Sequence, residues 1–217
     1  TTEKLLTKSS NAYGAKIDEV LLAGLARAVG RITGQKSVAI KLEGHGREEI
    51  HEPISIDRTV GWFTNIYAIL LKCNEDNDEA IINAKDTVRS VSNMGMGYGY
   101  VEHEDEPDIC FNYLGDFSGS KTSFVSEYST GNDVASENGL DSKVLINGQI
   151  SEDKLTLFIL SQYGQNFTEK IKNELEKSIE ELAEYCSKDE NDKKTISDME
   201  FDSLDVEGLS FINSLIG

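Results

Sequence analysis

The sequence predicts an α/β fold in which helices pack against a mixed β-sheet. Two observations carry this prediction. A helical pattern is followed by an alternating strand, a second helical pattern, several strands and a long closing helix. Apolar residues three or four positions apart mark the helices, and apolar–polar alternation marks the strands. At 217 residues the chain is long enough for one sizeable core or for two small subdomains packed together.

Three segments have the spacing of amphipathic helices. The first ends at Gly30 or Gly34 and has a stripe made of Ile17, Leu21, Leu25 and Val29. The second begins near Asn74, and its stripe is Ile81, Ala84, Val88 and Val91. The third has a longer stripe, formed by Phe167, Ile171, Leu175, Ile179, Leu182 and Cys186. Asn166 with Glu169 three residues later resembles a capping box at its start.

Strands are predicted for SVAIKLE (37–43), TVGWFTNIYAILLKC (59–73), DICFNYLGDF (108–117), KVLINGQI (143–150) and KLTLFILSQY (154–163). The last two form a predicted hairpin around SED, and the Ser/Gly/Asn-rich residues 118–142 predict a long loop. In the first strand, Val38, Ile40 and Leu42 share one face. Glu43 ends the strand on the opposite face.

Composition excludes several classes of function. The net charge of −18 argues against nucleic acid binding, which needs clustered Lys and Arg. No apolar run approaches the roughly 18 residues of a membrane span. The N-terminus has no signal-peptide pattern, and we expect the chain to be cut from a longer one. Three widely spaced cysteines, Cys73, Cys110 and Cys186, indicate reduced thiols in a cytoplasmic protein.

A change of composition divides the chain after Cys186. Residues 1–186 are expected to form the folded domain, and residues 187–217 an acidic linker followed by a short amphipathic segment. The last part, residues 195–217, interleaves acidic residues with Leu, Phe and Ile. Such a segment suits recognition by a basic partner surface, but a tail that docks on its own domain fits equally well.

Glu43 is the candidate for acid–base chemistry. A carboxylate at the end of a buried strand is expected to be desolvated, which suits it to accept or donate a proton. The flanking Gly44 and Gly46 allow another chain segment or a substrate to approach the backbone. An ordinary ion pair between Glu43 and Arg47 explains the same residues. Both interpretations are open at this point.

Other candidate sites are weaker. His45 and His51 with Glu48 and Glu49 do not have the spacing of metal ligands on an extended strand. The chain has no G-x-S-x-G sequence, so a nucleophile-elbow hydrolase is not indicated. His45 is expected to be structural or part of a channel wall. Trp62 and Phe63 are expected in the core, and an ordinary strand explains Asn112 and Tyr113 as well as a site does.

Four motifs occur together in one order. They are EGHGRE (43–48), RTVGWFTNIY (58–67), GMGYG (95–99) and FNYLGDF (111–117), preceded by DEVLLAGLA (18–26). Over residues 1–186 the chain resembles the C-terminal half of an epimerization domain of a non-ribosomal peptide synthetase, within the condensation-domain superfamily. Ala68 and Asp116 depart from the family pattern at the edges of two motifs.

The resemblance implies a chloramphenicol-acetyltransferase-like sandwich that is one half of a V-shaped domain, with the active site in the channel between two subdomains. It implies an isomerase that inverts L to D at Cα of an aminoacyl or peptidyl thioester. The substrate is carried on the phosphopantetheine arm of a carrier domain, and no cofactor is bound directly.

By the same resemblance, Glu43 is the acid/base, Arg47 orients or tunes it, and Asn112 and Tyr113 line the channel near the enolate. The family's H-H-x-x-x-D-G motif lies in its N-terminal half, and none of His45, His51 and His103 matches it. The missing half is therefore an implied partner, and this chain alone is expected to be inactive. Residues 195–217 loosely resemble segments that dock the next synthetase subunit.

Two alternatives remain beside the epimerase. One is half of a condensation domain that forms peptide bonds, although EGHGRE and RTVGWFT favour epimerization. The other is a non-catalytic interaction module.

Overall fold

The computed structural model describes residues 2–5, 13–47, 56, 58–103, 105–117, 138–139, 141–188 and 195. In chain order its elements are α1 (Thr2–Lys4), α3 (Ile17–Thr33), β1 (Ser37–Gly44), β2 (Asn65–Lys72), α4 (Asn77–Arg89), η2 (Ser92–Gly95), η3 (Tyr98–Tyr100), β3 (Ile109–Asp116), β4 (Val144–Ser151), β5 (Lys154–Ser161) and α5 (Gln165–Lys188). Helices and strands interleave as the sequence predicts, so the α/β class is confirmed.

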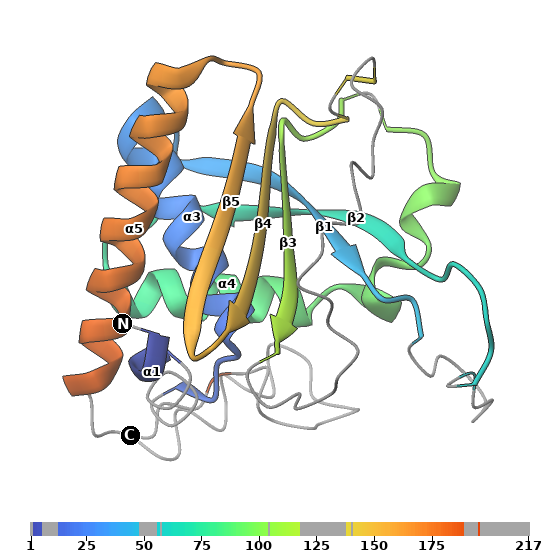
Figure 1. The fold of residues 1–217 in the computed structure, drawn as a ribbon, viewed down its shortest axis with the longest axis horizontal. Helices are drawn as coiled ribbons and strands as arrows, with labels where there is room; N and C mark the ends of the chain where they lie inside the picture. The colour runs from blue at the N-terminus through green and yellow to red at the C-terminus, as the bar shows by residue number, and fades with distance from the viewer. Residues whose placement is uncertain are drawn as a thin grey trace, which may run out of the picture.

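The five described strands form one mixed sheet in the order β2-β1-β3-β4-β5. β1 is antiparallel to β2 and parallel to β3, β3 is parallel to β4, and β4 is antiparallel to β5. In Figure 1, β1 and β2 run across the picture while β3, β4 and β5 stand upright, so the sheet is strongly twisted. The pairing of β1 with β3 covers only three residue pairs, from Ile40↔Ile109 to Leu42↔Phe111.

Helices α3, α4 and α5 pack on one face of this sheet and enclose the core (Figure 1). The buried strand side chains alternate as predicted: Val38, Ile40 and Leu42 of β1 point into the core, as do Tyr67, Ile69 and Leu71 of β2. From α5, Ile171, Leu175, Ile179, Leu182 and Cys186 join them. Burial of these apolar side chains is the main force that holds the helical layer on the sheet.

The other face of the sheet carries exposed side chains, several of them apolar. Ile66 and Leu70 of β2, Leu114 of β3, and Phe158 and Leu160 of β5 are all exposed. Each alternates along its strand with a residue of the opposite, helix-covered face. We call the face that carries them the open sheet face, and Glu43 belongs to it because it alternates with Leu42.

The helix ends agree with the sequence for α3 and differ for the other two. Gly34 caps α3 with a left-handed φ of 73°. Asp76 caps α4 by accepting a hydrogen bond from the Glu79 backbone N–H, and α4 stops at Arg89, so Val91 lies outside it. The predicted capping box of α5 is wrong, because Asn166 is already the second residue of that helix.

The predicted hairpin is confirmed, but the second predicted strand is too long. Glu152 and Asp153 both have positive φ, of 50° and 59°, as a two-residue turn between β4 and β5 requires. β2 begins only at Asn65, because residues 58–64 form a separate segment before it. Trp62 in that segment is 90% exposed, so its predicted place in the core is wrong. Most of the loop predicted at 118–142 lies outside the described residues.

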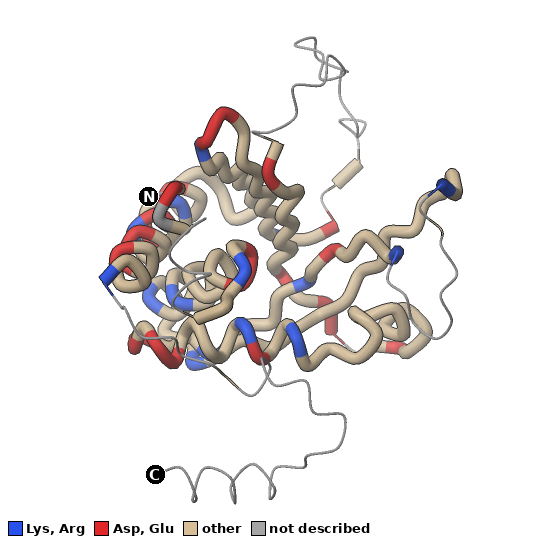
Figure 2. The backbone as a smooth tube through the Cα atoms, turned by 90° about the horizontal axis from the view of Figure 1, so that it is seen from below, with Lys and Arg blue, Asp and Glu red and all other residues tan. Residues whose placement is uncertain are grey.

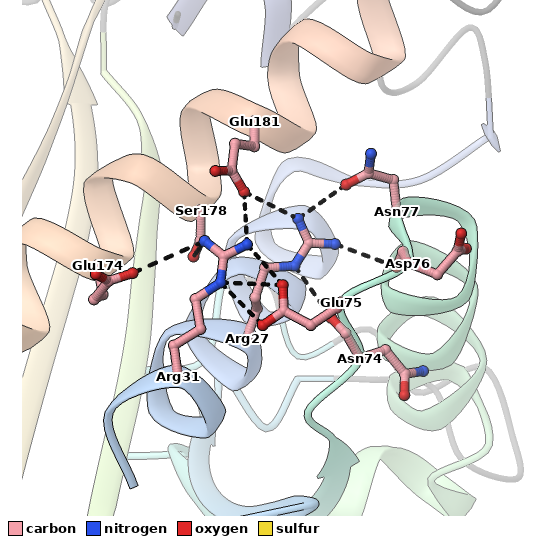
Figure 3. Close-up of polar contacts among 9 residues, drawn as sticks. All are labelled: Arg27, Arg31, Asn74, Glu75, Asp76, Asn77, Glu174, Ser178 and Glu181. Carbon is pink, nitrogen blue, oxygen red and sulfur yellow. Dashed lines mark hydrogen bonds and ion pairs between the residues drawn. The ribbon is translucent and has the colours of Figure 1, made fainter. Parts of the chain in front are cut away.

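Two arginines of α3 join the helices to one another (Figure 3). Arg27 donates hydrogen bonds to the Asn74 and Asp76 carbonyls and to Asn77, and its guanidinium lies 3.6 Å from a Glu181 carboxylate oxygen. Arg31 binds Glu75 and Glu181, with N–O distances of 2.7 and 2.9 Å. The cluster ties α3 to α5 and to the segment that leads into α4.

The C-terminal part of the chain is described only up to α5 and at Thr195. Helix α5 continues to Lys188, two residues beyond the domain boundary expected at 186. Thr195 is buried, and its hydroxyl donates to the Asp86 carboxylate of α4 at 2.9 Å. The remainder of the predicted docking tail lies outside the described residues.

In the view of Figure 2, acidic and basic residues of the described chain are intermingled. Acidic residues nonetheless predominate, which gives the net charge of −18. Of the helices that the structure describes, none is long and apolar enough to cross a membrane.

Candidate active site

Glu43 stands at the C-terminal end of β1, where strand β3 lies beside it. β1 and β3 pair in parallel through Lys41↔Cys110 and Leu42↔Phe111, so Asn112 is the next residue along β3 beside Glu43. The Asn112 side-chain amide donates a hydrogen bond of 3.1 Å to Glu43 Oε2. The Cys110 Sγ lies 4.0 Å from Glu43 Oε1. The structure therefore brings together two predicted site residues that are 69 positions apart in the sequence.

The Glu43 side chain is exposed, so its predicted desolvation is wrong for the described chain. The physical reason is its place on the open sheet face, where no described helix covers the end of β1. Its carboxylate is accessible to a reaction partner from this face while β3 holds both of its oxygens.

Cys110 is a site residue that sequence reasoning missed. Cys110 is buried. Burial is the largest cause that raises the pKa of its thiol to about 11, and the charge of the Glu43 carboxylate is the second largest. The Lys41 ammonium acts in the opposite direction, but it is itself paired with Glu106 at 3.6 Å. Strand alternation puts Lys41 and Glu43 on one face of β1. The same alternation puts Cys110 and Asn112 on one face of β3, and this pattern could have identified Cys110 from the sequence.

Arg47 does not contact Glu43. Its guanidinium donates to the Ile56 carbonyl at 2.7 Å and to the Thr59 carbonyl at 3.1 Å, and it lies 4.2 Å from the centroid of the Phe63 ring. The predicted ion pair with Glu43 is therefore wrong for the described structure, and the role in orienting or tuning Glu43 stays a prediction. Arg47 holds the segment that leads into β2, which projects away from the helical layer in Figure 1.

The two glycines of EGHGRE make room for this chain's own segments. A Cβ on Gly46, whose φ is 64°, would lie 1.6 Å from the Phe63 carbonyl oxygen. A Cβ on Gly44 would lie 2.4 Å from Asn65 Oδ1. Of the two occupants that the sequence left open, the structure shows a neighbouring chain segment.

His45 has an exposed ring whose Nδ1 accepts a hydrogen bond from the Arg47 backbone N–H at 3.1 Å. This contact closes the turn after β1, in keeping with the structural role expected for His45. His103 stacks on Tyr98, with ring centroids 3.7 Å apart. His51 and the acidic pair Glu48 and Glu49 lie outside the described residues.

Asn112 and Tyr113 do not line one surface. Asn112 faces Glu43, whereas Tyr113 packs against the helix-covered core, with its ring close to Gly148. Burial raises the pKa of Tyr113 to about 12, with Asp116 and Asp18 contributing less. Consecutive strand residues point to opposite faces, so Tyr113 does not share the open sheet face with Asn112 and Glu43.

The described residues provide no metal centre. Among them, no three His, Cys, Asp or Glu side chains are grouped closely enough to hold a metal ion. What the arrangement supplies is one exposed carboxylate with a neutral amide and a thiol beside it. That set can accept, hold and return a proton.

Similarity to solved structures shows the class of fold. The chain is similar to the epimerization domain from the third module of tyrocidine synthetase B, with a TM-score of 0.79 and 28% identity over 88% of this chain and 47% of that chain. The first condensation domain of the CDA synthetase has a TM-score of 0.55 at 14% identity, over 88% of this chain and 44% of that chain, which shows the fold alone. The chain therefore has the chloramphenicol-acetyltransferase-like fold of these domains.

The family follows from the sequence comparison. The family model described as "Condensation domain" matches residues 1–204, so the chain belongs to the condensation domain family. One of the mycosubtilin synthase polypeptides of Bacillus subtilis is 34% identical over 96% of this chain, and one of the plipastatin synthase polypeptides of Bacillus subtilis (strain 168) is 36% identical over 99%. The chain spans only 9% of the length of either relative.

Proposed function

We propose that this chain is the C-terminal half of a peptide synthetase epimerization domain. The domain would invert L to D at Cα of an aminoacyl or peptidyl thioester tethered to a carrier domain. The observation that carries the proposal is the exposed Glu43 carboxylate, held by β3 on the open sheet face. The higher similarity to an epimerization domain than to a condensation domain, with TM-scores of 0.79 and 0.55, supports it.

Epimerization needs a proton to leave Cα on one face and another to arrive on the opposite face. When the Cα–H bond breaks, its electron pair moves into the thioester carbonyl and forms an enolate, which hydrogen-bond donors stabilise. Glu43 is the group of this half that takes or returns the proton. The partner group on the other face is a histidine from the N-terminal half of the domain. In this scheme Tyr113 has no proton-transfer role, because it projects from the other face of β3.

The proposed reaction needs a carrier domain and the other half of the epimerization domain. The carrier domain presents its substrate on a phosphopantetheine arm, and the N-terminal half supplies the second wall of the channel. Residues 195–217 would select the next synthetase subunit. The assembly would act in the cytoplasm, without a metal or cofactor of its own.

The test is Glu43→Gln in the complete epimerization domain with a loaded carrier domain. The amide keeps the shape of the side chain but cannot take a proton, so we expect the rate of L-to-D conversion to fall at least about a hundredfold. Chiral analysis of the hydrolysed thioester measures this rate. Glu180→Gln, which removes an exposed charge from α5, is the matched control and should leave the rate within about twofold.

A Glu43→Gln rate within a few-fold of wild type would refute the assignment of Glu43. The isolated 217-residue chain should show no conversion in the same assay, and measurable conversion would refute the half-domain proposal.

A condensation-type half is the second candidate, because the matching family model is the one described as "Condensation domain". The same loaded carrier, offered together with an acceptor aminoacyl carrier, distinguishes the two. Peptide bond formation without inversion would favour condensation. Neither reaction from the complete domain would favour a non-catalytic interaction module.

A further inference from the structure

The Glu43 carboxylate is held from one side by two side chains of the same strand. Cys110 and Asn112 both lie on the face of β3 that neighbours Glu43, one near each carboxylate oxygen. We infer that Cys110 and Asn112 are positioning residues, which together fix the orientation of the Glu43 carboxylate toward the substrate. This inference rests on the proposed function, in which Glu43 transfers the proton.

The contact with Asn112 is the stronger of the two. Its amide donates to Oε2 at 3.1 Å, which is an ordinary hydrogen-bond length to a charged acceptor. The sheet fixes the position of Asn112. Strand β3 pairs with β1 up to Phe111, the residue before Asn112, and Asn112 itself pairs with Asn147 of β4 on the other side of β3. The donor therefore stands on a rigid element and not on a loop.

Cys110 adds a weaker contact with the other oxygen. Its Sγ lies 4.0 Å from Oε1, at the outer limit for a sulfur donor. Burial, and then the negative charge of Glu43, raise the pKa of this thiol to about 11, so it keeps its hydrogen at neutral pH and can donate it. Lys41 and Asp141 are the other charged groups that act on the thiol.

Two donors on one strand matter because Glu43 is exposed. A free glutamate side chain samples several rotamers, and each wrong rotamer moves the carboxylate away from the Cα proton. With both oxygens held, the carboxylate keeps one orientation, and proton transfer depends on such orientation. The positioning side chains would then affect the rate of the chemical step more than substrate binding.

The first experiment measures epimerization by the complete domain. Asn112→Asp keeps the shape of the side chain but replaces the donor with a second carboxylate. We expect kcat to fall about tenfold to a hundredfold, with KM unchanged within about twofold. Asn147→Ala, which removes the same residue type from the same face of the neighbouring strand, should leave kcat within about twofold. Cys110→Ala should lower kcat about three- to fivefold, and Cys110→Ser, which keeps a donor, should recover most of the loss.

The second experiment needs no activity. The chain is labelled with 13Cβ cysteine, and the cysteine signals are titrated by NMR up to pH 11 with and without Glu43→Gln. Removing the carboxylate should lower the pKa of the Cys110 thiol, so more thiolate forms at pH 10. The signal of Cys73, whose pKa is raised by burial and not by Glu43, is the internal control and should not change.

The two experiments separate the possible failures. If Glu43→Gln leaves the Cys110 titration unchanged, the thiol does not contact Glu43 and the inference is wrong whatever the activity. Equal kcat losses for Asn112→Asp and Asn147→Ala would also overturn it. If instead the thiol titration shifts but Glu43→Gln remains an active epimerase, the contact is real and the proposed function is wrong.

Discussion

Gly46 occupies a position that no other residue can fill without a shift of the chain. Its φ of 64° lies in the left-handed region, and a Cβ would meet the Phe63 carbonyl oxygen at 1.6 Å. The contact is with backbone, so a flexible side chain cannot simply turn aside. The turn after β1 and the segment before β2 therefore depend on this glycine.

We predict that Gly46→Ala lowers the free energy of unfolding by about 2–4 kcal/mol, because it adds both backbone strain and a steric clash. Urea unfolding followed by circular dichroism measures the change. Gly97→Ala is the matched control, because Gly97 has a φ of −83° and nothing within 4 Å of its Cβ position. A loss no larger than that of Gly97→Ala would show that the turn relaxes without cost.

The sequence motifs predicted some residues of the site and not others. Glu43 and Asn112 came from motifs, and the structure brings them together. Arg47 was misplaced because a charge four residues from Glu43 suggests a local ion pair, whereas its actual partners are carbonyls on the segment before β2. That pairing depends on how the chain folds back, which spacing alone does not encode.

Among the helices, Arg27 of α3 makes buried contacts with the neighbouring elements. Its side chain is 1% exposed, and it joins α3 to α5 and to the segment before α4 (Figure 3). Burial lowers its pKa, with the nearby Arg31 charge as the second cause. A buried cation of this kind is tolerated because carbonyl and amide oxygens surround it.

Arg27→Ala should therefore lower the free energy of unfolding by about 3–5 kcal/mol, since it leaves a cavity and removes the donor from the part-buried Asn74 and Asp76 carbonyls. Arg31→Ala, one turn later on the same helix, is the control. Its side chain is more exposed and its partner Glu75 is 63% exposed, so we expect a loss of about 1 kcal/mol. Thermal or urea unfolding compares the two variants, and equal losses would contradict a special role for Arg27.

For helices and strands, the periodicity of apolar residues predicted the structure correctly where one face of the element is buried and the other is solvated. The α5 stripe, the alternation of β1 and the β4–β5 hairpin were all confirmed. The start of β2 was wrong because VGWF has the composition of a strand while its valine and tryptophan are exposed. Composition does not reveal whether a neighbouring strand is present to pair with.

Two carboxylates with lowered pKa values link distant parts of the molecule. The Arg31 guanidinium lowers the pKa of Glu75, and Lys143, followed by Tyr163, lowers the pKa of Asp108. A carboxyl group whose pKa is lower in the folded state binds fewer protons there than in the unfolded state. Its stabilising effect is therefore complete above its ordinary pKa and is lost as the pH falls through the lowered value.

We predict that the urea midpoint falls between pH 7 and pH 3 and that the double variant Glu75→Gln/Asp108→Asn loses less over this range. The variant lacks the two titrating groups, so its stability at pH 7 is lower but depends less on pH. Glu180→Gln serves as the charge control. Equal pH dependence of wild type and double variant would show that other groups dominate acid unfolding.

For the whole molecule, sequence reasoning reached the α/β class and the family, and both are confirmed. It did not reveal that, in the described part of the chain, one face of the sheet carries exposed side chains, because apolar residues such as Phe158 and Leu160 look like core residues in a sequence. The desolvation expected for Glu43 failed for the same reason. Strand patterns show which residues share a face, but only the fold shows which face is covered.

The sheet topology also has a consequence for the time course of folding. β4 and β5 are joined by a two-residue turn, so their pairing closes a short loop and can form early. The β1–β3 contact instead joins residues 69 positions apart through only three ladder pairs. Glu43 therefore acquires its β3 neighbours late in folding. In pulse-labelled hydrogen exchange, amides of the hairpin should be protected before those of Lys41 and Leu42 at the β1–β3 border.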